Sequence, residues 1–191
     1  LCILSCRHHE GLHGLALGGP AAWGGRKKGE DGKIIPTDRP TTIFPQSYGL
    51  GATWDVDLVK KVGEQASLEA RYYMQRPEDK RTALVMRAPN ADLARDPRWG
   101  RTSEGFGEDP YLVSRIAAAM VRGYQGADPS DPQRIMASVK HFALYGAVEG
   151  GRDYNTVDMS LPKMYNDYLP PYRAALDAGA GGVMVALNSI N

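Results

Sequence analysis

The length, composition and charge of the chain describe a folded domain and exclude several classes of protein. The chain has 191 residues, and its 23 basic and 22 acidic side chains leave a formal net charge of +1. This balance argues against a nucleic-acid-binding domain, which would carry a clear basic excess. Apolar residues make up 42% of the sequence, as in globular proteins, and no apolar run approaches the roughly 18 residues of a membrane span.

Both ends of the sequence suggest a piece of a longer protein. It begins with Leu1 instead of methionine and stops at Asn191, directly after an apolar run. The two cysteines, Cys2 and Cys6, are too close together to brace a fold. Residues 1–6 are too short for a signal peptide and predict a buried strand, with a lipoprotein cleavage site at Cys6 as the disfavoured alternative.

The first half of the chain predicts a long loop, a helix and a strand. Residues 11–45 are rich in glycine and proline and predict a loop. Residues 55–73 carry apolar side chains at spacings of three and four, which predicts a helix with one buried face. A polar break over residues 75–81 precedes a short apolar run, residues 83–87, that predicts a second strand.

The second half opens with the clearest helix of the sequence. Asp109 suits its N-cap and Pro110 its first turn, and an apolar stripe runs from there until Gly126 ends the helix. The remaining elements are a strand over residues 136–142, a glycine-rich loop over residues 146–151, a helix that opens at Ser160, breaks at Pro170-Pro171 and ends at Gly179, and a strand over residues 183–187.

This alternation of strands and helices predicts an α/β fold with parallel strands and crossover helices. A doubly wound sheet and a (β/α)8 barrel both fit the pattern. No Gly-x-Gly-x-x-Gly follows a strand, so the dinucleotide-binding version of the first lacks its best marker. A full barrel needs about 250 residues, and the four predicted strands would therefore form a partial (β/α)8 TIM-type barrel.

Polar side chains cluster where the predicted strands end. The carboxyl ends of parallel strands form one rim, and binding sites lie there. The pattern therefore indicates a small-molecule enzyme site. The polar residues are His8, His9, Glu10 and His13 after the first strand, Asn90, Asp92, Arg95 and Asp96 after the second, Lys140 and His141 at the end of the third, and Asn188 and Ser189 after the fourth.

One short motif suggests a different chemistry. Residues 9–13 read His-Glu-Gly-Leu-His and match the zinc motif His-Glu-x-x-His, which needs a helix to bring both histidines to one face. Glycines surround the motif, and each costs about 1 kcal/mol in a helix. We therefore disfavour a zinc metalloprotease built on His9 and His13 and expect no metal.

Two other stretches allow both a binding site and a purely structural interpretation, such as a salt-bridged loop. Lys140 and His141 are neighbours on a strand and should face opposite sides, unless the backbone there is irregular. The run from Arg95 to Arg101 holds three arginines, and a guanidinium suits bidentate hydrogen bonding to neighbouring oxygens such as sugar hydroxyls. Glu104 and Glu108 follow closely and could hold those arginines.

These stretches resemble the N-terminal domain of glycoside hydrolase family 3, in its bacterial periplasmic β-glucosidase branch. The resemblance covers nearly the whole chain, in order. It rests on EGLHG (residues 10–14), FPQ (44–46), ATWD (52–55), APNADLARDPRWGRTSEGFGEDPYL (88–112), SVKHFA (138–143), YGAVEGGRDYN (145–155) and GVMVALNS (182–189).

The resemblance implies a (β/α)8-type barrel and a retaining, exo-acting glycosidase. Such enzymes use two carboxylates about 5–5.5 Å apart, one as nucleophile and one as acid/base. In the family the nucleophile lies on the strand after the last one here, and the acid/base comes from a later domain. Residues 1–191 would thus be an incomplete barrel domain that ends before the nucleophile strand, holds no catalytic carboxylate and is inactive alone.

The resemblance also implies the residues that bind the sugar. Matching by position gives Arg101, Lys140 and His141 as the clamps on sugar hydroxyls and Glu10 as the acidic residue of the site. Met184 matches an apolar wall residue, and Arg152 is a further candidate. No cofactor is implied.

The resemblance leaves the substrate between two sugars. Ala143 and Leu144 follow Lys-His-Phe where the β-N-acetylhexosaminidase branch has Pro-Gly, so we disfavour that branch. We prefer a β-glucosidase acting on terminal β-D-glucosyl residues, with a β-xylosidase or a non-catalytic sugar-binding fragment as alternatives. The expected partner is a small sugar, with no nucleic acid or membrane, and the expected location of the parent protein is periplasmic or secreted. An open half barrel exposes strand edges, so we expect marginal folding or aggregation in isolation.

Overall fold

In the computed structural model, four parallel strands form one sheet whose order follows the chain. The structure describes residues 8–16, 30–33, 40–76, 84–128 and 130–191. Neighbouring strands are parallel throughout, which confirms the predicted α/β class. The consecutive order is that of part of a (β/α)8 barrel. The strands are β1 (His8–His9), β2 (Val85–Met86), β3 (Met136–Phe142) and β4 (Gly182–Val185), in the order β1-β2-β3-β4.

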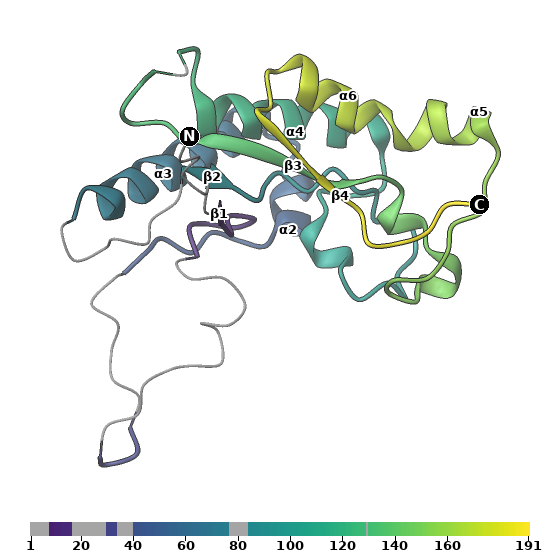
Figure 1. Ribbon diagram of the computed structural model, residues 1–191, viewed down its shortest axis with the longest axis horizontal. Helices are drawn as coiled ribbons and strands as arrows, with labels where there is room; N and C mark the ends of the chain where they lie inside the picture. The colour runs from purple at the N-terminus through teal and green to yellow at the C-terminus, as the bar shows by residue number, and fades with distance from the viewer. Residues whose placement is uncertain (1–7, 17–29, 34–39, 77–83, 129) are drawn as a thin grey trace, which may run out of the picture.

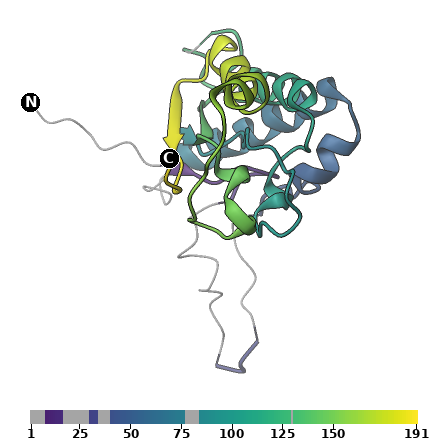
Figure 2. The same cartoon turned by 90° about the vertical axis from the view of Figure 1, so that its right-hand side faces the viewer.

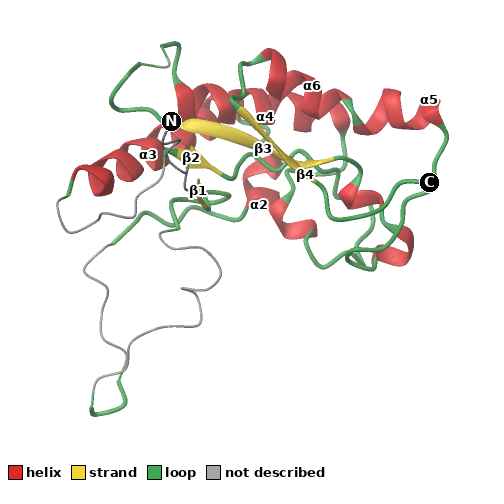
Figure 3. Cartoon of the chain, viewed as in Figure 1, coloured by secondary structure: helices red, strands yellow, loops and turns green. Residues whose placement is uncertain are grey.

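The longer helices cover one side of this sheet. Figures 1 and 2 show α3, α4 and α6 as a layer beside the strands, with α4 packed between the other two, and Figure 3 separates helices, strands and loops by colour. Within the described ranges, no helix is long and apolar enough to cross a membrane. The helices are α2 (Ser47–Ala52), α3 (Val56–Gln75), α4 (Pro110–Gln125), α5 (Leu161–Lys163) and α6 (Pro170–Asp177).

Helix α4 begins and ends where its sequence predicts. The Asp109 side chain accepts a hydrogen bond of 2.7 Å from the backbone N–H of Leu112, which satisfies one of the free amides of the first turn. Pro110 occupies the first turn, and Gly126 ends the helix with a φ of 66°, a conformation that glycine adopts without strain. Val113 and Ile116 are fully buried, so the apolar stripe faces the core.

Helices α3 and α4 approach closely because two glycines face each other. A Cβ on Gly123 would lie 2.4 Å from the backbone oxygen of Lys60 and 3.1 Å from the Cα of Gly63. A buried hydroxyl strengthens the same contact, since Ser67 Oγ donates to the backbone oxygen of Tyr124 at 2.9 Å. The two backbones therefore leave no room for a larger side chain at this crossing.

Several boundaries near the N-terminus differ from the prediction. The strand predicted over residues 1–6, with Cys2 and Cys6, lies outside the described residues. His8 and His9, which were expected to follow it, form β1 themselves. Helix α2 was not predicted, because its sequence Ser-Tyr-Gly-Leu-Gly-Ala contains two glycines, which disfavour a helix.

The C-terminal elements differ in smaller ways. The predicted glycine-rich loop forms two 3-10 turns, Tyr145–Ala147 and Glu149–Gly151. The helix that opens at Ser160 passes through a π turn, Met164–Tyr168, before α6. A bend at Leu169 separates the π turn from α6, which confirms the predicted break beside Pro170-Pro171. Both prolines belong to α6, because a proline at the first helical position loses no hydrogen bond.

Strand β4 is an edge of the sheet. Val183 is 43% exposed and Val185 is 74% exposed, and β4 pairs only with β3 among the described strands. An apolar edge strand of this kind is a template for pairing with further chain.

Candidate functional site

Polar residues near the carboxyl ends of β1, β2 and β3 meet at one end of the sheet. Beyond β2, Asn90 continues the pairing with Lys140 in a parallel bridge, and the backbone N–H of Ala91 donates to the Lys140 oxygen at 2.7 Å. This pairing carries the rim of the sheet past the last residue of β2. The side chains gathered here form the strand-end cluster: Glu10, Asp92, Arg101, Glu104, Lys140 and His141.

Lys140 is the buried cation of the cluster. Its side chain is only 4% exposed, and its Nζ lies 3.3 Å from Glu10 Oε2 and 3.8 Å from Glu104 Oε2. Glu10 has a second partner, because Arg87 Nη1 lies 3.0 Å from Glu10 Oε1. A charge removed from water needs such partners to be tolerated in a folded protein. Glu10 after β1 and Lys140 on β3 are therefore held together across the sheet.

Arg101 joins the cluster from the long loop between β2 and α4. Its guanidinium forms two parallel hydrogen bonds with Glu104, of 2.7 and 2.8 Å, a geometry that fixes the plane of the group. Its Nη2 also lies 3.0 Å from His141 Nε2, and its Cζ lies 5.3 Å from the centre of the Tyr145 ring. The prediction that Glu104 holds an arginine of this loop is confirmed for Arg101.

His141 is buried in the cluster between a carboxylate and an aromatic ring. It is 2% exposed, its Nδ1 lies 2.8 Å from Asp92 Oδ2, and Tyr172 donates its hydroxyl to Asp92 Oδ1 at 2.6 Å. The Tyr145 ring meets the imidazole edge to face, with centroids 5.0 Å apart. Tyr145 in turn packs against Trp99, so the cluster has an aromatic wall.

The electrostatics of the cluster favour its charged forms. Burial acts to raise the pKa of Glu104, but hydrogen bonds from Arg101 and the positive charges of Arg101 and Lys140 outweigh it, and the pKa of Glu104 lies below its usual value. Burial likewise acts to lower the pKa of Arg101, but Glu104 and Tyr145 outweigh it and raise that pKa. Tyr145, in the aromatic wall beside the cluster, is instead kept in its neutral form, because burial raises its pKa and Asp153 raises that pKa further.

Lys140 and His141 face the same side of the sheet, although neighbours on a regular strand face opposite sides. Both side chains are buried in the same cluster, although they are neighbours on β3. The backbone is irregular here: the β3–β4 register shifts between Val139 and Phe142, and the Lys140–His141 peptide bond is cis.

The cluster does not take in every residue predicted to bind sugar. Glu10, Arg101, Lys140 and His141 are brought together, but the described hydrogen bonds and ion pairs of the cluster include neither Arg152 nor Met184. Arg152 is exposed in the turn after the second 3-10 turn, and Met184 is half-buried on β4. Their assignment to the site stays a prediction.

The zinc arrangement is not formed. Residues 8–16 make strand β1, isolated bridges and a turn, with no helix. His9 is buried, whereas His13 is exposed. Within the part of the chain that the structure describes, no group of three or more histidine, cysteine, aspartate or glutamate side chains could hold a metal ion.

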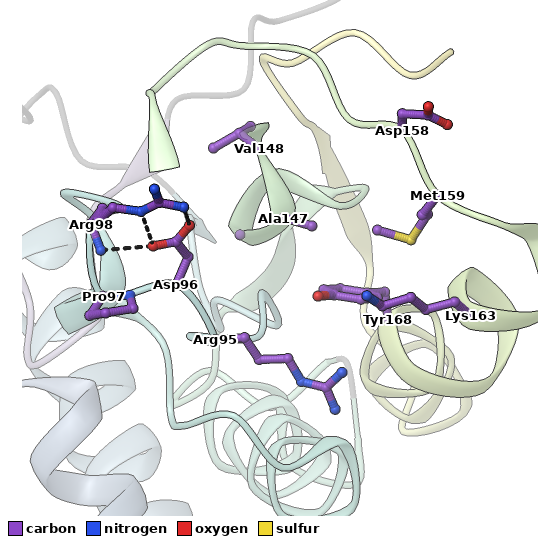
Figure 4. A pocket seen from close by; sticks show the side chains of 11 residues that line it. Arg95, Asp96, Pro97, Arg98, Ala147, Val148, Asp158, Met159, Lys163 and Tyr168 are labelled. Carbon is purple, nitrogen blue, oxygen red and sulfur yellow. Dashed lines mark hydrogen bonds and ion pairs between the residues drawn. The ribbon is translucent and has the colours of Figure 1, made fainter. Parts of the chain in front are cut away.

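A pocket of about 480 Å³ is lined by residues 95–98, by Ala147 and Val148, and by Lys163 and Tyr168 (Figure 4). None of the predicted sugar-binding residues lines it. Its charges are largely neutralised within the chain: Arg98 lowers the pKa of Asp96 to about 2 through hydrogen bonds, and Arg95 pairs with Asp167 at 2.7 Å. Arg95 also donates to the backbone oxygen of Glu108 at 3.1 Å, so Glu108 holds this arginine through its main chain.

Three residues of the site were not singled out from the sequence. Asp92 was noted only as a polar residue after the second strand, and Tyr145 and Tyr172 had no assigned role. Asp92 could have been found from the sequence, because it lies within the long family motif that begins at Ala88 and contains Arg101. Tyr172 lies 31 residues beyond the histidine whose backbone oxygen it contacts, and no local pattern signals that contact.

The arrangement can bind a neutral polyhydroxylated ligand. Lysine and arginine supply donors, glutamate supplies acceptors, and the aromatic wall supplies an apolar face. A hydroxyl group is both donor and acceptor, so a ring of hydroxyls matches such a mixed set. If Arg87, which pairs with Glu10, is counted with the cluster, three cations face three carboxylates, and there is no excess that would select a charged ligand.

Comparison with known proteins places the chain among enzymes that act on glycosides. The family model described as "Glycosyl hydrolase family 3 N terminal domain" matches residues 28–191. A periplasmic β-glucosidase of Salmonella typhimurium is 53% identical over 150 residues, which are 78% of this chain and 19% of that enzyme. A β-xylosidase of Formosa agariphila is 34% identical over 198 residues, which are 100% of this chain and 24% of that enzyme. The chain therefore spans about a fifth to a quarter of these relatives.

Two solved structures of β-glucosidases superpose on this chain. A mutant β-glucosidase from Listeria innocua, in complex with laminaribiose, superposes with a TM-score of 0.71 and 45% identity, over 78% of this chain and 20% of that chain. A β-glucosidase from Erythrobacter marinus superposes with a TM-score of 0.76 and 35% identity, over 96% of this chain and 21% of that chain.

Proposed function

Because the chain belongs to glycosyl hydrolase family 3, we propose that it forms the sugar-binding side of the active site in a retaining β-glycosidase. The observation that carries this proposal is the strand-end cluster. It joins Glu10 to Lys140 at 3.3 Å and Arg101 to His141 at 3.0 Å, and Glu104 links the two pairs by contacting both Arg101 and Lys140. These side chains would clamp the hydroxyls of the terminal sugar, and polar contacts that strengthen in the transition state also lower the barrier to reaction.

The chemical step would need groups that are not in the cluster. A retaining glycosidase needs a carboxylate nucleophile and an acid/base about 5–5.5 Å apart. Glu10 and Glu104 are each tied up by cations and suit binding better than attack on the sugar. We propose that both catalytic carboxylates come from parts of the parent protein other than residues 1–191, so that the chain alone hydrolyses no glycoside.

We propose a terminal β-D-glucosyl residue as the preferred substrate and β-D-xylosyl as the alternative. The higher identity to the Salmonella typhimurium β-glucosidase supports the first, and the match of the whole chain to part of the Formosa agariphila β-xylosidase supports the second. We also propose a periplasmic or secreted location for the parent protein, since the first of these relatives is named as periplasmic.

The test is a grafted enzyme, in which the matching 150 residues of this chain replace their counterpart in the Salmonella typhimurium enzyme. We expect it to hydrolyse 4-nitrophenyl β-D-glucoside with a higher kcat/KM than the β-D-xyloside. The reverse preference would assign the chain to xylosides. A folded grafted enzyme that cleaves neither substrate, beside an active host enzyme, would overturn the proposed function.

A further inference from the structure

We propose that Asp92 and Tyr172 are positioning residues, which hold His141 as a neutral imidazole with its proton on Nδ1 and its Nε2 lone pair toward Arg101. This inference rests on the proposed function for its effect on turnover. The state of the ring itself can be measured without any sugar.

The contact with Asp92 assigns the proton on Nδ1. His141 Nδ1 lies 2.8 Å from Asp92 Oδ2, and an ionised carboxylate has only acceptors to offer. The other oxygen of Asp92 accepts the Tyr172 hydroxyl at 2.6 Å. Each of the three residues is only 2% exposed, so water does not compete for these bonds. Nδ1 is therefore the donor in this pair.

The contact with Arg101 independently assigns the lone pair on Nε2. Arg101 Nη2 lies 3.0 Å from His141 Nε2, and a guanidinium carries donors and no acceptor. A proton on Nε2 would place two N–H groups against each other. The doubly protonated ring and the opposite tautomer are both incompatible with this contact, so the two sides of the imidazole agree on one state.

Tyr172 orients the carboxylate of Asp92, and this carboxylate in turn orients the imidazole of His141. Its hydroxyl comes from α6 and lies 2.6 Å from Asp92 Oδ1 and 2.7 Å from the backbone oxygen of His141. It thus reaches the end of β2 and the end of β3 at once. A residue that orients the carboxylate bound to a histidine also orients the histidine ring. Through Tyr172 and Asp92, helix α6 therefore orients the imidazole of His141.

The assigned state has a consequence for sugar recognition. Arg101 offers only donors and His141 Nε2 only an acceptor, so a sugar hydroxyl that displaces their direct contact can accept from the first and donate to the second. The opposite tautomer would present two donors to that hydroxyl, whose own proton would then lack an acceptor. Asp92 and Tyr172 therefore decide which hydrogen-bond polarity the site offers.

The first test reads the ring directly, by nitrogen-15 NMR of the full chain with labelled histidine. The chain has 4 histidines, and the signal lost in His141→Gln identifies His141. We expect an unprotonated Nε2 and a protonated Nδ1 in the chain as it is, and a proton moved to Nε2 in Asp92→Asn, in which an amide replaces the carboxylate. An Nε2 that is already protonated, or a tautomer unchanged in Asp92→Asn, would overturn the inference.

The second test uses the grafted enzyme and does not depend on the folding of the isolated chain. We expect Asp92→Asn to lower kcat/KM about 10- to 100-fold and Tyr172→Phe about 3- to 10-fold. Tyr73→Phe is the matched control, because it removes a buried hydroxyl that donates to the Pro40 backbone oxygen away from the cluster. We expect that variant to keep its activity.

The decisive comparison repeats both substitutions in a His141→Gln background. If Asp92 and Tyr172 act through the ring, neither change lowers the residual kcat/KM further. Full losses that persist without the imidazole would show a merely structural role and overturn the inference. A grafted enzyme with no glycosidase activity would instead refute the proposed function, and the NMR result would still decide the tautomer.

Discussion

The α3–α4 helix pair and the strand-end cluster are both buried, but they are held together by different forces. In the helix pair, apolar side chains and two facing glycines bring the backbones into contact. In the strand-end cluster, charged side chains lie largely out of water, most of them against a partner of opposite charge and Asp92 against the hydrogen-bond donors of His141 and Tyr172. Burial of apolar surface stabilises a fold, whereas burial of charge costs free energy even when the charges are paired. The comparison teaches that the helix pair stabilises the fold and that the cluster needs another reason to exist, such as ligand binding.

The largest effect expected from this difference is a loss of activity without a loss of fold. In the grafted enzyme, Lys140→Met should lower kcat/KM about 100- to 1000-fold, the usual effect of removing one preorganised donor. Its melting temperature should change little, because Glu10 and Glu104 keep Arg87 and Arg101 as partners.

The control for Lys140→Met is Lys60→Met, which removes an exposed lysine 3.1 Å from Glu64 on α3. We expect this variant to leave both kcat/KM and the melting temperature unchanged. A Lys140→Met enzyme that unfolds early would make the cluster a part of the stabilising core and erase the contrast with the helix pair.

The next largest effect is a loss of stability caused by a substitution in the helix pair, away from the cluster. Gly123→Ala places a Cβ within 2.4 Å of the Lys60 backbone oxygen and should lower the free energy of unfolding by about 2–3 kcal/mol, as overpacked cores do. Urea denaturation followed by circular dichroism measures the change. Gly49→Ala is the control, because its Cβ would meet only Pro45 Cβ at 3.7 Å, and an unchanged midpoint in Gly123→Ala would disprove the tight crossing.

A smaller effect concerns the start of the helix pair. Asp109→Ala removes the side chain that caps the first turn of α4 and should cost about 1 kcal/mol of stability. Glu108→Ala, at the exposed neighbouring position, should cost nothing measurable. Equal urea midpoints for the two variants would show that the cap does not contribute.

The smallest effect is a pH dependence at the β1 end of the sheet. Burial lowers the pKa of His9 from 6.5, and the charge of Arg87 lowers it further. The unfolded chain therefore binds this proton before the folded chain as pH falls. The contribution of His9 to stability is complete above pH 6.5 and is lost as pH falls toward the folded-state pKa.

Glu104 should add a second loss at lower pH. Its pKa lies below 4.5 in the folded chain, so its contribution is complete above pH 4.5 and is lost as pH falls through the folded value. Urea midpoints measured between pH 7 and pH 3 should fall in both windows, and His9→Gln should flatten only the upper one. A curve that His9→Gln leaves unchanged would contradict the first assignment.

Local patterns in the sequence were enough for the elements whose stabilising contacts are local. Helix α4 was predicted from Asp109 to Gly126 because its cap, its first-turn proline and its apolar stripe lie within one stretch. The strand Met136–Phe142 was predicted for the same reason, since an apolar run between turns is visible locally. Helix α2 was missed because its glycines oppose a helix, and packing overrides that preference: a Cβ on Gly51 would lie 1.8 Å from the Phe106 backbone oxygen.

The sequence by itself determined the α/β class, the family and four of the residues that meet in the cluster, because these depend on periodicity and on long motifs. Only the tertiary structure decided that Lys140 and His141 face the same side, that Glu104 binds Arg101 and Lys140 together, and that Tyr172 reaches Asp92 from 80 residues away. Arg152 and Met184 were assigned to the site from their positions in the motifs, but neither takes part in the described hydrogen bonds and ion pairs of the cluster. The physical reason is that hydrogen bonds and ion pairs act over a few ångströms, and only the folded sheet brings residues so distant in the chain to that separation.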